Sequence, residues 1–170
     1  ILFTIMLIIG LVPILTEPVF AAGTIVDENG VSYSSLQNAF DAATEGTSKT
    51  FYLTGDLGAS YEYTNIRMRN NATVQLISQS PDTTITGTLS MLNGGTLIVG
   101  DDYSTNKILL KGGIAVENGN LITNSSLSIV TSRVGYESIY LGYSGNTNKI
   151  TASINGTSIY NSSSVNAIYA

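Results

Sequence analysis

The sequence predicts a mainly β protein built as a parallel β-helix, or β-solenoid, with one amphipathic helix ahead of its coils. Three features predict it: a low charge content combined with many apolar residues, a repeat of short period-two segments, and one helical pattern before that repeat. Only 11% of the 170 residues are charged, whereas 43% are hydrophobic. Globular domains average about 25% charged residues, and exposed helix faces are rich in Lys and Glu. The composition therefore favours β structure over a helical bundle.

Charge and residue usage exclude several classes of function. The net charge is −5, and the seven basic residues are scattered, with Arg67 and Arg69 as the closest pair. Phosphate backbones are bound by clustered Lys and Arg, so we expect no nucleic-acid partner. The chain has no Cys and no His. Disulfides, thiolate metal sites and the commonest catalytic base are therefore excluded.

Residues 1–22 have the pattern of a secretory signal peptide. The run ILFTIMLIIGLVPIL is apolar over 15 residues and is followed by Pro18 and by small residues at Ala21 and Ala22. A membrane span needs about 20 apolar residues, whereas a short apolar run before small residues suits a cleavable signal. The start lacks Met and basic residues, so we expect the signal to be truncated. An uncleaved membrane anchor is the alternative, and both readings place the protein outside the cell.

Residues 23–60 are expected to form an N-terminal cap containing a helix over 34–43. Ser34 and Gln37 have the spacing of a capping box, and Gly46 is a plausible stop. The segment Thr50 to Thr54 reads as a first strand, closed by Gly55-Asp56. The apolar face of the helix follows the spacing i, i+3, i+4, i+7, at Leu36, Ala39, Phe40 and Ala43.

Residues 61–170 repeat with a period of about 25 residues. The segment IRMRNNATVQL begins at Ile66 and LSMLNGGTLIV at Leu89; IAVENGNL begins at Ile114 and a shorter copy at Ile139, and a fifth opens at Ile168. Each copy reads apolar-x-apolar, then Asn or a turn, then apolar-x-apolar. Periods of 20–50 residues indicate solenoids, and short period-two segments make each unit a β coil. Both the fifth copy and the coil series are expected to be incomplete at the C-terminus.

The alignment of the copies predicts which residues stack. One interior column is expected to hold Ile66, Leu89, Ile114 and Ile139, and a second to hold Met68, Met91, Val116 and Leu141. Asn70, Asn93 and Asn118 fall at a tight corner, where Asn tolerates the left-handed conformation. Their amides are expected to hydrogen-bond from coil to coil.

The helix pattern SLQNAFDAA, the Gly-containing loop, the strand ending in Gly-Asp and the Asn/Gly-cornered coils together resemble the pectin-lyase-like right-handed β-helix. More narrowly, they resemble adhesin-like surface proteins of gut microbes. The resemblance covers about residues 24–170, and it implies a right-handed coil with the helix covering its N-terminal end. An uncovered coil would offer open strand edges to other chains.

The coils contain no evident catalytic constellation. Acidic residues of different coils do not share a coil position, so neither a carboxylate pair nor a Ca²⁺ cluster is expected, and no cofactor is implied. Asp101 and Asp102 are the best metal candidates, but they lie in a Gly-Asp-Asp-Tyr turn, where Asp is common for backbone reasons. We expect the turn role.

Tyrosine is the remaining candidate for binding. Tyr140 and Tyr169 occupy the same outward position of consecutive coils, and Tyr143 lies nearby. Exposed Tyr side chains stack on sugars or bury in protein interfaces. Reinforcement of strand pairing is the simpler explanation.

We therefore expect a noncatalytic cell-surface adhesin or stalk segment that presents a rigid β-helix to an extracellular glycan or surface protein, with the membrane involved only through the signal segment or an anchor elsewhere. The alternative is the N-terminal part of a polysaccharide lyase or glycoside hydrolase with catalytic coils beyond Ala170. A passive scaffold layer is a third possibility.

Overall fold

The computed structural model describes residues 23–58, 61, 64–132, 137–142, 148–161 and 167–170. The predicted signal segment, 1–22, lies outside the described residues. Within the described part, none of the helical structure combines the length and apolar character required to cross a membrane.

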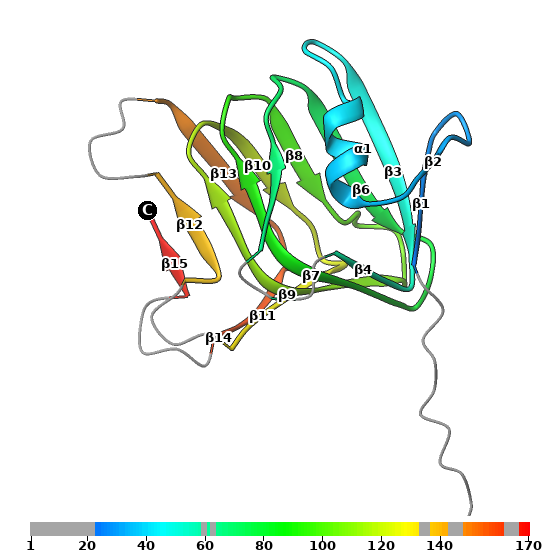
Figure 1. Cartoon of the computed structure of the whole chain (residues 1–170). Helices are drawn as coiled ribbons and strands as arrows, with labels where there is room; N and C mark the ends of the chain where they lie inside the picture. Colours follow the sequence, from blue (N-terminus) through cyan, green and yellow to red (C-terminus); the bar gives the residue numbers. More distant parts are fainter. Residues whose placement is uncertain (1–22, 59–60, 62–63, 133–136, 143–147, 162–166) are drawn as a thin grey trace, which may run out of the picture.

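The described part of the chain opens with two short strands and an α-helix, and continues mainly as β-strands (Figure 1). The first three elements are β1 (Thr24–Asp27), β2 (Ser32–Tyr33) and α1 (Leu36–Ala42). The strands that follow are β3 (Ser48–Thr54), β4 (Asp56–Gly58), β5 (Asn65–Met68), β6 (Thr73–Ser78), β7 (Asp82–Met91), β8 (Thr96–Val99), β9 (Lys107–Val116), β10 (Gly119–Thr123), β11 (Leu127–Thr131), β12 (Ile139–Leu141), β13 (Ile150–Ile154), β14 (Ser158–Asn161) and β15 (Ile168–Tyr169).

These strands wind as successive coils of a parallel β-solenoid. One sheet stacks β3, β6, β8, β10 and β13, each parallel to the next. The remaining strands also pair in parallel from coil to coil. The short strands β4 and β5 both pair with the long strand β7, and β7 pairs with the long strand β9. In turn β9 pairs with β11 and β12, which pair with β14 and β15 respectively. The predicted mainly β parallel solenoid is confirmed, whereas its right-handed sense stays a prediction.

The register of the coils matches the predicted interior columns residue for residue. Ile66 pairs with Leu89, Leu89 with Ile114, and Ile139 with Ile114. The fifth copy joins the same column, because Ile168 pairs with Ile139. The second column pairs Met68, Met91, Val116 and Leu141 in the same way. Apart from Leu141, which is partly exposed, and Ile168, which is exposed, these side chains are buried. Their periodic placement drives the coils together by removing apolar surface from water.

The helix starts one residue later than its predicted capping box. Ser35 is the N-cap, and its Oγ accepts a hydrogen bond from Asn38 N at 3.1 Å. Ser34 Oγ instead accepts from Asn38 Nδ2 at 2.7 Å. The Ser34–Gln37 box was therefore wrong. The apolar face was correct, because Leu36, Ala39 and Phe40 are all buried.

Gln37 is free of the box and contacts the first coil instead. Its Nε2 donates to Arg67 O at 2.9 Å, and its Oε1 accepts from Arg67 N at 2.8 Å. The side-chain amide thus hydrogen-bonds the edge of β5 as a neighbouring strand would. On the adjoining sheet, β1 pairs antiparallel with β3. The helix α1 and the strand β1 therefore lie at the same end of the stack, opposite β15 (Figure 1).

Of the predicted Asn column, Asn70 and Asn93 hydrogen-bond to the preceding segment of the chain, whereas the Asn118 side chain has no partner among the described residues. Asn70 Nδ2 donates to Ala43 O at 2.8 Å, and Asn93 Nδ2 donates to Arg69 O at 2.7 Å. The acceptors are main-chain carbonyls rather than other amides. Only glycines have positive φ among the described residues, so the left-handed conformation expected for these Asn residues was wrong. The adjacent glycines adopt the positive-φ positions of the turn.

Candidate functional site

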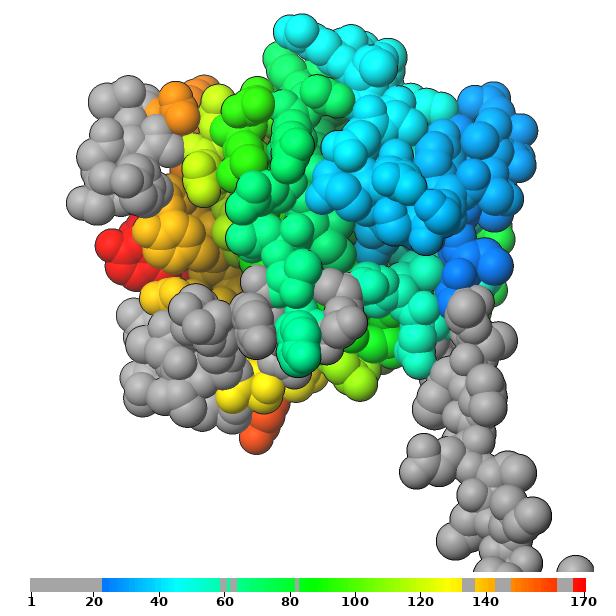
Figure 2. Space-filling view, viewed as in Figure 1, coloured from blue at the N-terminus to red at the C-terminus, as the bar shows by residue number. Residues whose placement is uncertain are grey.

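A polar groove runs along the row of turns that precede the strands of the first sheet. The turns ahead of β3, β6, β8 and β10 lie side by side along one margin of the molecule, and Lys149, just ahead of β13, continues the row (Figure 1). In the space-filling view the row runs along the top, from cyan through green to orange (Figure 2). The groove encloses about 420 Å³ and is open to solvent.

The groove exists because glycine lets successive turns approach closely. Gly95 has φ +87°, and a Cβ on it would lie 2.3 Å from Ala72 O of the preceding coil. Gly119 has φ +116°, and its Cβ would lie 2.7 Å from Gly95 O. No other residue fits this backbone and this spacing. Main-chain atoms of successive turns therefore lie close together where these glycines line the groove.

One wall is a ladder of outward-facing polar side chains at the start of the sheet. Thr73, Thr96, Asn120 and Thr151 pair with one another across four successive coils. Asn120 Nδ2 donates to Thr96 Oγ1 at 3.3 Å, and Thr151 Oγ1 donates to Asn120 Oδ1. Repeated registry thus places hydroxyl and amide groups one strand spacing apart, about 4.8 Å.

Two further amides of the lining, those of Asn71 and Asn118, flank the space above Gly94. The position of a Cβ on Gly94 would lie 3.6 Å from Asn71 Oδ1 and 3.8 Å from Asn118 Nδ2. Asn71 is exposed and Asn118 is half-buried. Among the described residues, neither side-chain amide has a hydrogen-bond partner. The two groups therefore present free donor and acceptor capacity to the space above a bare glycine.

The groove is almost uncharged. Of the described residues that line it, Lys149 alone is ionised at neutral pH, at the end that lies beside β13. The lining is otherwise hydroxyl, amide and main chain. Such a surface can accept and donate hydrogen bonds, but it supplies neither a nucleophile activated by a base nor a pair of carboxylates.

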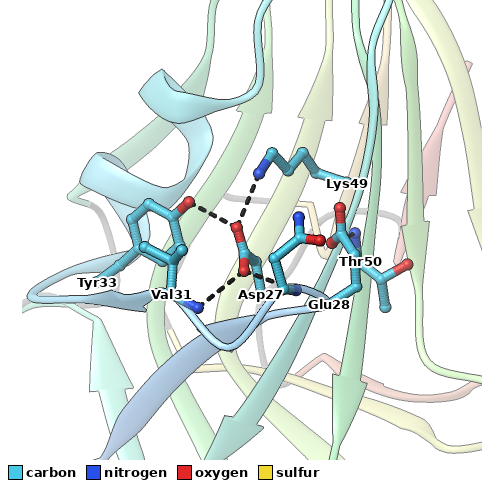
Figure 3. Close-up of polar contacts among 7 residues, drawn as sticks. Asp27, Glu28, Val31, Tyr33, Lys49 and Thr50 are labelled. Atoms are coloured by element: carbon cyan, nitrogen blue, oxygen red, sulfur yellow. Dashed lines mark hydrogen bonds and ion pairs between the residues drawn. The ribbon is translucent and has the colours of Figure 1, made fainter.

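The most strongly perturbed ionisable groups lie elsewhere, around the buried carboxylate of Asp27 (Figure 3). Its Oδ2 accepts from Lys49 Nζ at 2.8 Å and from Tyr33 Oη at 2.9 Å. Its Oδ1 accepts from the main-chain N–H groups of Asn29 and Val31 at 2.9 and 3.0 Å. The carboxylate therefore receives a charged donor, a phenol and two amides.

These contacts fix the charge states of the cluster. The hydrogen bond from Lys49 is the main cause that holds the pKa of Asp27 far below its ordinary value, against the opposing effect of burial. The same bond raises the pKa of Lys49. Burial, followed by the hydrogen bond to Asp27, raises the pKa of Tyr33. The four donors come from the turn between β1 and β2, from Tyr33 of β2 and from Lys49 of β3, so the cluster ties that hairpin to β3 rather than forming an open site.

Asp101 and Asp102 lie in a turn, as the sequence suggested. Asp101 Oδ1 accepts from the N–H groups of Tyr103 and Ser104, at 2.8 and 2.5 Å. Asp102 Oδ1 accepts from Ser125 N at 3.3 Å. Within the described ranges, acidic residues do not gather in threes in a way that would hold a metal ion.

Tyr140 and Tyr169 stack on each other. Their strands pair in register, the ring centroids are 5.2 Å apart and the rings are nearly parallel, at 6°. One face of each ring is thus occupied by the other, which reinforces the pairing of β12 with β15. Tyr143 lies outside the described residues, so the predicted binding role of the three tyrosines stays a prediction.

The sequence did not identify the groove as a site. Its signal was the small segment between the paired strands, NAT in one coil, GGT in the next and NGN in the third. These residues were interpreted as turn formers only. Asn71 and Asn118 flank Gly94 because of the way the coils stack. The turn of the third copy is one residue shorter than the others, which shifts Asn118 relative to the turns before it.

Comparison with protein-family models, with curated proteins and with solved structures finds no match for this chain. The resemblance to adhesin-like proteins of the pectin-lyase-like fold therefore stays a prediction, while the parallel solenoid itself is observed.

Proposed function

We propose that this protein is exported and acts at a cell surface as a noncatalytic adhesin or stalk segment, presenting its solenoid to an extracellular glycan or surface protein. The observation that carries the proposal is the groove of hydroxyl, amide and main-chain groups that crosses successive coils. Export is supported by the apolar segment before Ala21.

The chemistry of the described residues supports binding more than catalysis. The strongly shifted groups, Asp27, Tyr33 and Lys49, satisfy one another at a hairpin. The groove has one ammonium and no carboxylate among its described lining. A rigid stack suits binding through many weak contacts, because its groups are already held in place before a ligand arrives.

The competing function is the N-terminal part of a polysaccharide lyase or glycoside hydrolase. The parallel solenoid is compatible with both functions, because a fold does not specify an activity. The two proposals differ in turnover, which gives a direct test.

A glycan array and a cell-binding assay on the full chain test the proposal, together with an assay for polysaccharide cleavage. We expect retention on glycan or cells without release of reducing ends or unsaturated products. Polysaccharide cleavage by the purified chain would overturn the noncatalytic function and favour the enzyme.

A further inference from the structure

We propose that Asn71 and Asn118 form a binding site for an uncharged oligosaccharide, which lies across Gly94 and along the groove parallel to the solenoid axis. This inference rests on the proposed function, and it names the site and the class of ligand. It is carried by the two amides that flank the space above Gly94, a residue without a side chain, and that have no hydrogen-bond partner among the described residues.

The space above Gly94 has the form of a hydroxyl-binding subsite. The position that a Cβ would fill is 3.6 Å from Asn71 Oδ1 and 3.8 Å from Asn118 Nδ2. A sugar hydroxyl both donates and accepts, so one hydroxyl or two neighbouring ones satisfy both amides. Because each amide carries a donor and an acceptor, the match holds for either orientation of the amide groups.

The polar ladder of the lining extends the same chemistry along the axis. Thr73 and Thr96 lie in adjacent coils, and Asn120 and Thr151 continue the ladder. Polar groups therefore recur once per coil, at about 4.8 Å. An extended chain of sugar rings offers hydroxyls repeatedly along its length, so a linear oligosaccharide contacts several coils at once.

Charge and shape favour this ligand over the other classes. A polyanion would find one cation in the described lining, the ammonium of Lys149. It would be repelled by the net charge of −5 of the protein, and Glu45 and Glu117 adjoin lining residues in the sequence. A protein partner needs apolar or aromatic contacts at the centre of its interface. Apart from Lys149, the described lining offers only hydroxyl groups, amides, glycines and one alanine. An uncharged polyhydroxyl ligand is not repelled by the negative charge of the protein, and it binds through hydrogen bonds rather than apolar contacts.

The test is a titration of the full chain with three probes: cellohexaose and mannohexaose, which are uncharged, and hexagalacturonate, which is anionic. The double variant Asn71→Ala/Asn118→Ala removes both amides. Gln75→Ala is the matched control, because Gln75 is a half-buried amide facing outward on the same sheet but outside the groove lining. Thermal unfolding of each variant checks that the solenoid is retained.

We expect at least one uncharged hexasaccharide to bind, the double variant to lose about tenfold or more in affinity, and Gln75→Ala to bind as the parent does. Asn118→Asp, which keeps the shape but removes the donor, should also weaken binding.

Unchanged affinity in the folded double variant would overturn the site while leaving the adhesin proposal intact. Binding of hexagalacturonate alone, or of no saccharide, would overturn the ligand class; cell adhesion without saccharide binding would then support a protein partner.

Discussion

At the scale of single residues, the structure depends on a few positions whose chemistry is unusual for their surroundings. Asp27 is buried with 2% of its surface exposed, and its charge is balanced by Lys49. Gly95 holds a backbone that only glycine adopts without strain. Both kinds of residue are recognisable in a sequence as an acid or a glycine, but their roles depend on partners more than 20 positions away.

Asp27 makes the stability of the protein depend on pH. Its folded-state pKa is lowered, so its contribution is complete above the ordinary value of 3.8 and is lost as the pH falls below it. We expect the melting temperature to fall steadily below about pH 4, and this slope to be weaker in Asp27→Asn. At pH 7 that variant should be less stable than the parent. Melts at several pH values check this; identical slopes in the two proteins would refute it.

Lys49→Met should be more destabilising at pH 7 than Asp27→Asn, because it leaves a buried carboxylate without its cation. The difference should be smaller at pH 3, because protonation of Asp27 at lower pH removes the unpaired buried charge. Chemical denaturation at both pH values measures it. Equal stability of the two variants at pH 7 would contradict the ion pair.

Gly95→Ala separates crowding from backbone strain when it is compared with Gly30→Ala. Both glycines have positive φ, +87° and +80°, but only Gly95 faces a main-chain oxygen, whereas nothing lies within 4 Å of a Cβ on Gly30. We expect Gly30→Ala to cost roughly 1–2 kcal/mol, and Gly95→Ala roughly 2–4 kcal/mol. Similar costs in urea unfolding would mean that the turns do not pack as closely as described.

At the scale of elements, the sequence was most informative where side chains alternate between core and solvent. The register that pairs positions 66, 89, 114, 139 and 168 was predicted correctly, because a one-residue slip would have moved every apolar side chain to the wrong face. The long strands β7 and β9 begin well before these positions, at Asp82 and Lys107. Hydrogen bonds made by amides were less predictable. Gln37 was assigned to a capping box but pairs with β5, since only the folded chain brings Arg67 to it.

The interior column predicts a gradient in the cost of truncation. Leu89 is fully buried between two neighbours of its column, whereas Ile168 is 39% exposed. We expect Leu89→Ala to cost roughly 2–5 kcal/mol and Ile168→Ala about 1 kcal/mol or less. Urea unfolding of both variants measures the difference, and a larger cost at Ile168 would contradict the column.

Gln37→Ala tests whether the helix side chain completes the edge of β5. The change removes two hydrogen bonds to Arg67, and we expect a loss of about 1–2 kcal/mol. It also frees a strand edge, so light scattering should detect more self-association than in the parent. Gln75→Ala, which removes an amide without a strand-edge contact, should change neither quantity. If both variants behave alike, Gln37 has no role at the edge.

At the scale of the whole molecule, the stacking of coils determines both the fold and the polar groove. Repetition of short polar turns creates a groove that no single coil contains, and parallel registry brings Asn71 and Asn118 together from different coils. Composition and period predicted the solenoid. They did not predict the groove, because turn lengths set how neighbouring side chains face each other.

In-register stacking is the central claim, and a disulfide between adjacent coils tests it most directly, because the chain has no cysteine of its own. Gln75 pairs with Ile98, and Ile98 with Ile122, on the outward face of one sheet. The pair Gln75→Cys/Ile98→Cys should form an intramolecular disulfide in high yield under mild oxidation. The pair Gln75→Cys/Ile122→Cys, two coils or about 9.6 Å apart, should not. Mass spectrometry of the oxidised proteins distinguishes the two results, and cross-linking of the second pair but not the first would contradict the parallel solenoid.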